Sequence, residues 1–331
     1  DAAEMTEDIA ATNLVSALAS LAEQSLRKDL IEVLVILNGT GVAAGGDAMQ
    51  IALRNSLASR FPELSIRVMR SLAPGAGRAR NLGIASASRR FITFLDDDDA
   101  LQPKYLETGL ENADDGAITL LPIVDTTDGT STQENSLNAR IATLRGMTVL
   151  VATAPWALGF NASKIIPTTL AQRYRYDESL RSGEDVAYFA NFLRSPGLLL
   201  HTPKAGEETA YVRSIRPDSV SRQRESFDFN VVQRLECIAK LRDIEEADTK
   251  PRALEKLEQA QFGFVENYLK AHPGEVQQAI NTAVDAGVPG LNWENLRQER
   301  ASRLVFSYCF PLGCVIGYLI VMLIIIAAYL F

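Results

Sequence analysis

Apolar positions follow two different spacings along the first 125 residues of the chain. In Asn13–Gln24 they fall at 14, 15, 18 and 21, which is the spacing of one helix face. Ile31–Leu37 is instead a continuous, largely β-branched run that ends at Asn38-Gly39, as expected of a buried strand followed by a turn. The same reasoning predicts helices over 47–60, 77–86 and 103–111, and strands over 65–69, 91–95 and 117–124.

This alternation of strands and helices predicts an α/β fold with a mostly parallel sheet covered by helices on both faces. Ligands of such sheets usually bind beyond the carboxyl ends of the strands. Asn38 follows the first predicted strand, and the four consecutive aspartates Asp96–Asp99 follow the strand over 91–95. We therefore expect a functional site at that edge of the sheet. Residues 125–175 follow no regular pattern.

A helical pattern returns between residues 226 and 303. Val231–Ile244 and Ala253–Ala271 are amphipathic, and His272-Pro273-Gly274 breaks the second of these helices. We expect residues 1–225 to form the α/β domain. Residues 226–303 are expected to form a helical extension that links this domain to the last segment of the chain.

The last 28 residues, Leu304–Phe331, contain no charged side chain. About 20 apolar residues span a bilayer core, so this segment predicts a single transmembrane helix in the cell membrane. A buried helix of a soluble core is the alternative, but such helices seldom stay apolar on every face over this length. Arg297, Arg300 and Arg303 precede the segment. The positive-inside rule therefore predicts that residues 1–303 lie in the cytoplasm.

Composition narrows the classes of partner and site. The net charge is −8 and the pI is about 5.0, which disfavours nucleic acid as a main partner. The three cysteines show no framework spacing, as expected in a reducing compartment, and the two histidines are too far apart in sequence to suggest zinc. Residues 1–13 carry neither a secretory signal nor an initiator methionine. We therefore expect the chain to begin inside a longer protein.

The run Asp96–Asp99 at a strand end is the first chemical signal. Like charges repel at short distance, and each loses hydration beside a core. A divalent cation relieves both costs, and Mg²⁺ and Mn²⁺ prefer carboxylate oxygens while keeping waters and substrate phosphates as further ligands. The alternative is an exposed acidic turn, with Asp99 capping the following helix.

Two further stretches carry candidate site residues. Arg80 lies in GRARN, where a helix start and guanidinium groups suit an anion, although an ordinary basic helix face explains the same residues. Glu184 and Asp185 follow Gly183 at the start of a predicted helix. The helix dipole favours acidic side chains there. On local grounds alone, simple N-terminal capping is the favoured explanation of Glu184 and Asp185.

Taken in order, these stretches resemble the inverting GT-A glycosyltransferases of the family 2 type. The matching features are a helix with a glutamine near its end, a strand ending in Asn-Gly-Thr, the ARN loop, a strand ending in D-x-D-D, a Pro-Trp segment, Glu-Asp, and Arg followed by Ser-x-Ser. They cover about residues 10–225. The resemblance implies a GT-A, Rossmann-like fold and a divalent metal, Mn²⁺ or Mg²⁺, as cofactor.

The resemblance also implies a role for each matching position. Asp185 falls on the general base, with Glu184 beside it, and Trp156 falls on the acceptor side. Asp96 and Asp98 fall on the metal-binding motif, with Asp98 as the direct ligand. The positions implied to bind the nucleotide-sugar are Asn38 at the base, Arg80, Asp96, Asp97, Arg213, Arg216, Ser219 and Ser221.

One feature departs from the family pattern. The family begins with a strand that reads like V-I-I-P-x-Y-N and lines the base pocket, and nothing before Asn13 resembles it. We therefore expect the first strand of the fold to be missing from residues 1–225, which puts donor binding in question.

The expected function is that of a membrane-anchored, metal-dependent inverting glycosyltransferase. It would move a sugar from a UDP-sugar or another nucleotide-sugar to a hydroxyl of a lipid-linked or cell-envelope glycan. Two alternatives stay open. A nucleotidyltransferase on a related sheet would use the metal without needing Asp185 as a base. A non-catalytic membrane scaffold would not bind nucleotide in a metal-dependent manner.

Overall fold

The computed structural model describes residues 13–127, 130–132, 135–204, 206–215, 225–244 and 252–288. Contacts between Cα atoms divide the chain into two compact units. The first holds residues 1–224 and 240–259, and the second holds residues 225–239 and 260–331. The predicted transmembrane helix over 304–331, its flanking arginines, and Arg216, Ser219 and Ser221 lie outside the described residues. Within the described ranges, no helix is both long enough and apolar enough to cross a membrane.

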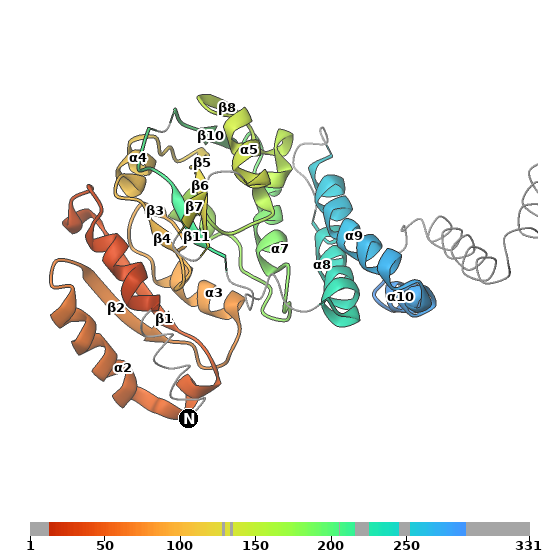
Figure 1. The fold of residues 1–331 in the computed structure, drawn as a ribbon, viewed down its shortest axis with the longest axis horizontal. Coiled ribbons are helices and arrows are strands. Elements are labelled where there is room, and N and C mark those ends of the chain that lie inside the picture. Colours follow the sequence, from red (N-terminus) through yellow and green to blue (C-terminus); the bar gives the residue numbers. More distant parts are fainter. Residues whose placement is uncertain are drawn as a thin grey trace, which may run out of the picture. The chain divides into compact units, whose positions relative to one another are not determined.

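The first unit opens with a helix over 13–22 and a two-stranded parallel sheet. Strand β1 (Glu32–Leu37) pairs with β2 (Ser65–Arg70) in a register that runs from Glu32 opposite Ser65 to Leu37 opposite Arg70. Helix α2 (Thr40–Arg60) connects the two strands and packs on β2. Helix α3 (Ala76–Ser86) packs on β1 (Figure 1).

A five-stranded sheet contributes much of the buried core of this unit. Its order is β3 (Phe91–Ile92), β9 (Lys164–Pro167), β5 (Ala117–Leu120), β10 (Leu199–Thr202) and β8 (Met147–Leu150). Only β5 and β10 run parallel, and the other three pairs are antiparallel. Every residue of the central strand β5 is buried.

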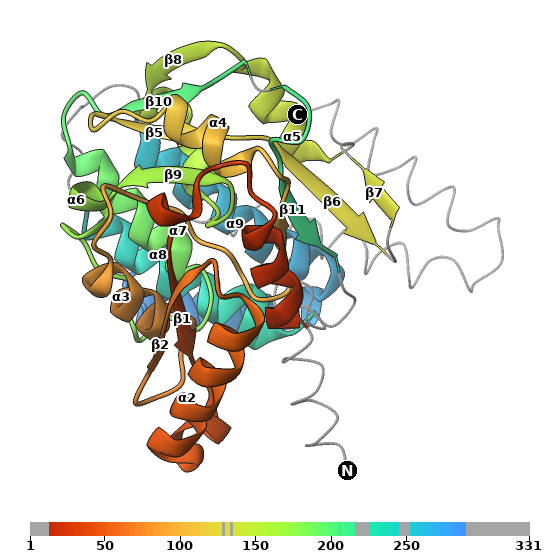
Figure 2. The ribbon, with the colours of Figure 1, turned by 90° about the vertical axis from the view of Figure 1, so that its left-hand side faces the viewer.

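A four-stranded sheet completes the first unit. Its order is β4 (Ala100–Leu101), β11 (Tyr211–Ser214), β6 (Ile123–Thr127) and β7 (Thr130–Thr132). Strands β11 and β6 run parallel, whereas β11 with β4 and β6 with β7 are antiparallel. Figure 2 shows β6, β7 and β11 side by side.

The α/β class is confirmed, but the prediction of a mostly parallel sheet is wrong. Among the described strands, parallel pairing occurs in β1–β2, β5–β10 and β6–β11, and the other five pairings are antiparallel. The single strand expected over 117–124 is two strands, β5 and β6, which belong to different sheets. Pro122 lies between them and has no N–H to continue a ladder. Strands β8 and β9 supply antiparallel pairings from the stretch that shows no regular pattern in sequence.

The other predicted elements of the first unit are present with shifted ends. The strand expected over 91–95 is shortened to Phe91–Ile92. The helix expected over 103–111 is α4 (Tyr105–Glu111). The described short helices that sequence patterns did not predict are α5 (Ser136–Thr143), α6 (Thr168–Ala171), and the 3₁₀ turns η1 (Lys28–Leu30), η2 (Val151–Thr153), η3 (Pro155–Leu158) and η4 (Asn191–Arg194).

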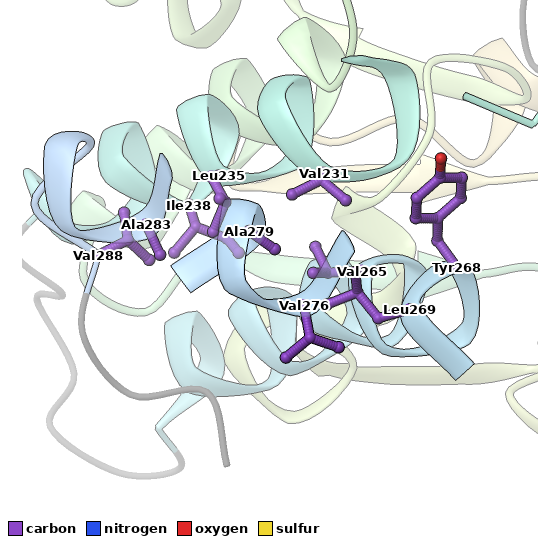
Figure 3. Close-up of a cluster of buried hydrophobic side chains, with 10 residues drawn as sticks. All are labelled: Val231, Leu235, Ile238, Val265, Tyr268, Leu269, Val276, Ala279, Ala283 and Val288. Carbon is purple, nitrogen blue, oxygen red and sulfur yellow. The ribbon is translucent and has the colours of Figure 1, made fainter. Parts of the chain in front are cut away.

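The predicted helices of the C-terminal part are confirmed within its described residues. They are α8 (Gln233–Arg242), preceded by a π-helical turn over Asp228–Val232, and α9 (Ala253–Ala271). A 3₁₀ turn over Pro273–Glu275 follows the predicted break and leads into α10 (Val276–Asp285). Figure 3 shows the buried cluster of the second unit. Its members, all at most 3% exposed, are Val231, Leu235, Ile238, Val265, Tyr268, Leu269, Val276, Ala279, Ala283 and Val288.

Candidate active site

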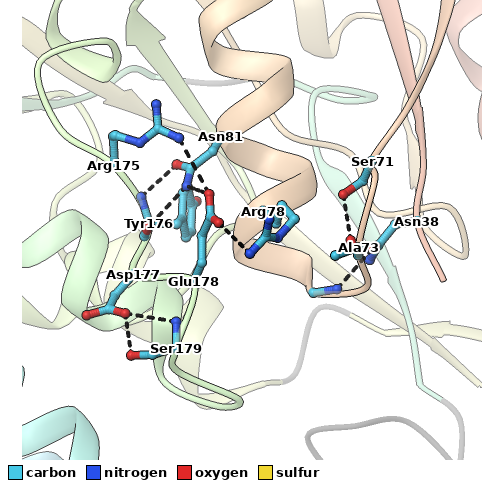
Figure 4. A network of polar contacts seen from close by, with 11 residues as sticks. Asn38, Ser71, Ala73, Arg78, Asn81, Arg175, Tyr176, Asp177, Glu178 and Ser179 are labelled. Carbon is cyan, nitrogen blue, oxygen red and sulfur yellow. Dashed lines mark hydrogen bonds and ion pairs between the residues drawn. The ribbon is translucent and has the colours of Figure 1, made fainter. Parts of the chain in front are cut away.

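The loop before α3 is held in place by the side chain of Asn38, the residue that follows β1. Gly75 has a φ of 139°, a conformation that L side chains rarely adopt. The Oδ1 atom of Asn38 accepts a hydrogen bond of 3.0 Å from the Gly75 N–H. The Ser71 hydroxyl donates to the Ala73 carbonyl over 2.7 Å on the other side of the same loop (Figure 4). The start of α3 is therefore placed by residues at the carboxyl ends of both β1 and β2.

Arg80 joins three parts of the first unit. Its Nη1 lies 2.7 Å from Oε1 of Glu184 at the start of α7 (Glu184–Ala190), and its Nη2 lies 3.5 Å from Oδ1 of Asp96. Its guanidinium carbon lies 5.5 Å from the ring centre of Tyr176, within the range of a cation–π contact. Although burial opposes it, the neighbouring Tyr176, Asp96 and Glu184 raise the pKa of Arg80. The structure thus brings together Arg80, Asp96 and Glu184.

The Tyr176 ring that contacts Arg80 is itself stacked on a second tyrosine. The Tyr176 ring stacks on Tyr188 of α7 with centroids 4.0 Å apart and planes 9° from parallel. Asn81 holds the Tyr176 backbone: its Oδ1 accepts from the Tyr176 N–H and its Nδ2 donates to the Tyr176 carbonyl (Figure 4). The Asn of the ARN stretch is therefore buried and structural, while the neighbouring Arg80 reaches the acidic groups.

Glu184 and Asp185 begin α7 after a left-handed residue. Gly183 has a φ of 75°, which glycine adopts without steric cost. Asp185 Oδ1 accepts a 2.8 Å hydrogen bond from the Val186 N–H. Burial and the nearby Glu184 carboxylate raise the pKa of Asp185 to about 6, against the opposing effect of Arg80. A carboxylate with such a pKa can take a proton near neutral pH.

The four aspartates after β3 have different surroundings. Asp96 and Asp97 are exposed, Asp98 is half-buried, and Asp99 is 7% exposed. Asp99 accepts from the Tyr211 hydroxyl at 2.7 Å and from the Ser214 N–H at 2.8 Å. The next helix begins only at Tyr105, so Asp99 does not cap it, and that alternative for Asp99 is wrong. Burial raises the pKa of Asp99 to about 7.

This carboxylate run suits a metal that arrives with a ligand of its own. The described ranges contain no group of three or more histidine, cysteine, aspartate or glutamate side chains placed to hold a metal ion. Mg²⁺ and Mn²⁺ in nucleotide sites are commonly held by one or two carboxylates, with phosphate oxygens and waters completing the shell. Asp96 and Asp98 fit this arrangement, in which two carboxylates hold the metal and the bound nucleotide and waters supply the other ligands.

The remaining described candidates have partners of their own. Arg213 makes a two-pronged contact with Asp125, in which Nε and Nη2 each lie 2.9 Å from a carboxylate oxygen. Trp156 lies in η3, which packs against α7, and the Arg140 guanidinium carbon is 6.0 Å from the Trp156 ring.

Residues 9–163 match the family model described as Glycosyl transferase family 2. This match spans just under half of the 331 residues, so that part of the chain is similar to glycosyl transferase family 2. The chain is 28% identical over 234 residues to the Succinoglycan biosynthesis protein ExoO of Rhizobium meliloti (strain 1021), a match that covers 66% of this chain and 63% of that protein. It is 33% identical over 104 residues to the Putative glycosyltransferase EpsH of Bacillus subtilis (strain 168), covering 31% of this chain and 27% of that protein. The chain therefore matches less than two thirds of the length of either relative.

Solved structures with a similar fold support the GT-A-like architecture. S. aureus TarS 1-349 in complex with UDP superimposes with a TM-score of 0.52 at 17% identity, over 88% of this chain and 84% of that one. The mannosyltransferase PcManGT from Pyrobaculum calidifontis, in complex with GDP-Man and Mn²⁺, has a TM-score of 0.50 at 16% identity, over 88% and 76%. The chain thus has an α/β GT-A-like fold with mixed sheets and C-terminal helices.

Sequence reasoning missed three features around the candidate site. The first is the cation–π contact of the Tyr176 ring with the Arg80 guanidinium, and the second is the hydrogen bond from the Tyr211 hydroxyl to Asp99. Lys164 is 1% exposed, with its ammonium bound to the Phe160 carbonyl and 4.7 Å from the Phe189 ring centre. Burial lowers the pKa of Lys164 and the Asp185 charge opposes that effect. A lysine opening the apolar run KIIP is the only local signal of this buried charge.

Proposed function

We propose that the protein transfers a sugar from a nucleotide-sugar donor to a hydroxyl group of a glycan, with inversion at the anomeric carbon. The observation that carries the proposal is the pairing of Arg80 with both Asp96 and Glu184. These contacts bring the carboxylate run, a half-buried guanidinium and the start of α7 close together, which supports a single shared site. The match of residues 9–163 to glycosyl transferase family 2, and the UDP and GDP-Man named in the two solved structures, support a nucleotide-sugar donor.

On this proposal Asp98 and Asp96 hold a divalent cation, Mn²⁺ or Mg²⁺, which would neutralise charge on the departing nucleoside diphosphate. The Mn²⁺ in the PcManGT structure supports this choice of metal. The guanidinium of Arg80 adds a fixed positive charge beside Asp96. The other donor-binding residues would be Asn38, Asp97, Arg213, Arg216, Ser219 and Ser221.

Asp185 is the proposed base, which removes the proton of the acceptor hydroxyl as its oxygen attacks the anomeric carbon. The raised pKa of Asp185, about 6, suits that task. Glu184 is less suited because its Oε1 is already engaged with Arg80. We assign Glu184 the role of holding Arg80 and the start of α7. Trp156 is proposed to lie on the acceptor side.

The acceptor is proposed to be a lipid-linked or cell-envelope glycan. The named role of ExoO in succinoglycan biosynthesis supports a polysaccharide product. The charge-free segment 304–331 supports a single membrane anchor, with the catalytic residues on the cytoplasmic side. The proposed α/β domain ends near residue 225, and the proposed helical extension between it and the membrane segment ends near residue 303.

A melting-temperature screen of the full chain in detergent tests the proposal. UDP, GDP and their sugars are added with and without Mn²⁺, because a ligand that binds the folded state raises the melting temperature by mass action. We expect at least one nucleotide to raise it only when Mn²⁺ is present. Asp98→Asn should remove that rise, whereas Asp115→Asn, at an exposed ion pair with Arg90, should keep it.

Two outcomes would overturn the proposal. A chain that binds no nucleotide with Mn²⁺ would fit a scaffold. A chain that binds nucleotide and releases pyrophosphate, without transferring sugar, would fit a nucleotidyltransferase.

A further inference from the structure

Strand β11 is bonded to both ends of the aspartate run. The Tyr211 hydroxyl donates to Asp99 Oδ2 over 2.7 Å and accepts from the Asp96 N–H over 3.3 Å. Two residues further along β11, the Ser214 N–H donates to Asp99 Oδ1 over 2.8 Å. Within the run, the Asp99 N–H donates to the Asp96 carbonyl over 3.1 Å. These four hydrogen bonds define the backbone path of residues 96–99.

Tyr211 is itself fixed in the sheet and in the core. It is 1% exposed, and β11 lies between β4 and β6, with Tyr211 opposite Leu101 on one side and Ile123 on the other. The Tyr211 ring packs edge-on against Tyr105, with centroids 6.3 Å apart and planes at 69°. Because these contacts hold Tyr211 on three sides, its hydroxyl is a rigid point of attachment for the aspartate run.

We propose that Tyr211 and Asp99 are positioning residues that hold the run Asp96–Asp99 in the shape needed to bind a divalent cation together with a nucleoside diphosphate. This inference rests on the proposed function. Both oxygens of Asp99 are already engaged by Tyr211 and Ser214, so Asp99 attaches the run to β11 and leaves Asp96 and Asp98 as the proposed ligands of the cation.

The physical reason is the cost of holding like charges together. Adjacent carboxylates repel, and a loop free to relax would separate them before the cation arrives. Binding would then have to restore the arrangement and would lose affinity by that amount. A run held by hydrogen bonds from a fixed strand avoids most of this loss, as expected of a preorganised site.

Calorimetry on the full chain with two matched tyrosine variants tests the inference. Tyr211→Phe removes the hydroxyl that binds Asp99 and Asp96 but keeps the ring against Tyr105. Tyr105→Phe is the control: this residue is equally buried, and its hydroxyl lies 3.3 Å from Thr93 Oγ1, away from the aspartate run. The quantity measured is the gain in UDP or GDP affinity on adding Mn²⁺, with the melting temperature recorded alongside.

We expect Tyr211→Phe to reduce the Mn²⁺-dependent gain by about ten-fold, as for loss of one or two buried hydrogen bonds, and to leave the metal-free nucleotide affinity within about two-fold. Tyr105→Phe should keep the gain. Asp99→Asn, which keeps the acceptor for Ser214, should show a smaller reduction than Tyr211→Phe.

The outcomes separate this inference from the function on which it rests. A native chain without any Mn²⁺-dependent gain would overturn both. A native chain with the gain, and a Tyr211→Phe variant that keeps it while melting at a lower temperature, would overturn only the positioning role. Equal reductions in the Tyr211→Phe and Tyr105→Phe variants would also overturn it, because the effect would then follow from core packing.

Discussion

The side chain of Asn81 binds both backbone groups of Tyr176, accepting from its N–H at 2.8 Å and donating to its carbonyl at 3.0 Å. This pair joins α3 to a segment 95 residues away. Because Tyr176 stacks on Tyr188 and contacts the Arg80 guanidinium, the position of that guanidinium depends on the buried amide of Asn81.

Asn81→Ala should therefore lower both stability and activity. Two buried backbone groups of Tyr176 lose their partner, at about 1–3 kcal/mol for each unsatisfied group. Urea unfolding measures the loss. The control is Asn112→Ala, which removes one half-buried bond to the Thr108 carbonyl at the end of α4 and should cost about 1 kcal/mol or less. Equal losses in the two variants would contradict the special role of Asn81.

The start of α3 packs closely on the same segment, so two glycines of this helix should respond differently to alanine. A Cβ on Gly77 would lie 3.1 Å from Tyr176 Cβ and 3.4 Å from the Asp177 carbonyl oxygen. A Cβ on Gly83 would make only an ordinary contact, 3.6 Å from Ile36 Cγ1. Gly83→Ala should stabilise by about 0.5–1 kcal/mol through helix propensity. We expect Gly77→Ala to lose that gain, and unfolding curves that rank the two variants the other way would refute the close approach.

Asp185→Asn should separate catalysis from stability. If Asp185 is the base, turnover falls by about 10²-fold or more while donor and metal affinity stay within a few-fold. Glu184→Gln should cost less, because the amide oxygen still accepts from Arg80. Turnover of the native chain should rise with pH through about 6, the raised pKa of Asp185. An Asp185→Asn variant with native turnover would eliminate this assignment.

The same raised pKa makes a prediction about folding. The folded state keeps the Asp185 proton up to about pH 6, whereas an unfolded chain releases it near pH 4. The folded state thus binds more protons between these values, and the contribution of Asp185 to stability falls as pH rises through that window. Asp185→Asn should therefore compare more favourably with the native chain at pH 8 than at pH 4. Simple helix capping by Asp185 predicts instead a loss of about 1 kcal/mol at pH 8.

Lys164 supplies a test with the opposite sign. Burial lowers its pKa, so between the folded value and its usual value near 10.4 the unfolded chain binds more protons, and stability rises with pH. Lys164→Met removes this penalty. Relative to the native chain, the variant should therefore be most stable at low pH, with the difference shrinking towards pH 10. Lys104→Met, at an exposed pair with Glu208, is the control and should change stability by less than about 1 kcal/mol throughout.

Sequence patterns predicted those elements whose signals are local. Helix α9 begins and ends where expected, since an amphipathic stripe over 253–271 meets the break at His272-Pro273-Gly274. Strand direction was not predictable in this way, because every described pairing except the local one of β6 with β7 joins segments far apart in the chain. β9, for example, pairs with β3 and β5 although its four residues carry no alternation.

The same distinction between local and long-range signals applies to the residues of the candidate site. The acidic run and Arg80 stand out as charges beside apolar stretches, and the family resemblance put Glu184 and Asp185 with them. The burial of Asp99 and the support from Tyr176 and Tyr211 depend on tertiary contacts. A tyrosine in YRYDE or YVRS carries no local sign that its ring or hydroxyl will meet a residue about 100 positions away.

The position of β9 limits how the chain can be shortened. The segment recognised as family 2 ends at residue 163, one residue before β9, and β10 begins only at Leu199. Strand β5 pairs with these two later strands, β9 and β10, and Gly109 of α4 packs directly on Ile165 of β9. A polypeptide that ended at residue 163 would leave both edges of the apolar strand β5 without a hydrogen-bonded neighbour. Unpaired edges of an apolar strand promote aggregation. Folding of the sheet during synthesis must therefore wait until residue 202 has emerged, so the segment that matches the family model is shorter than the segment needed to complete this sheet.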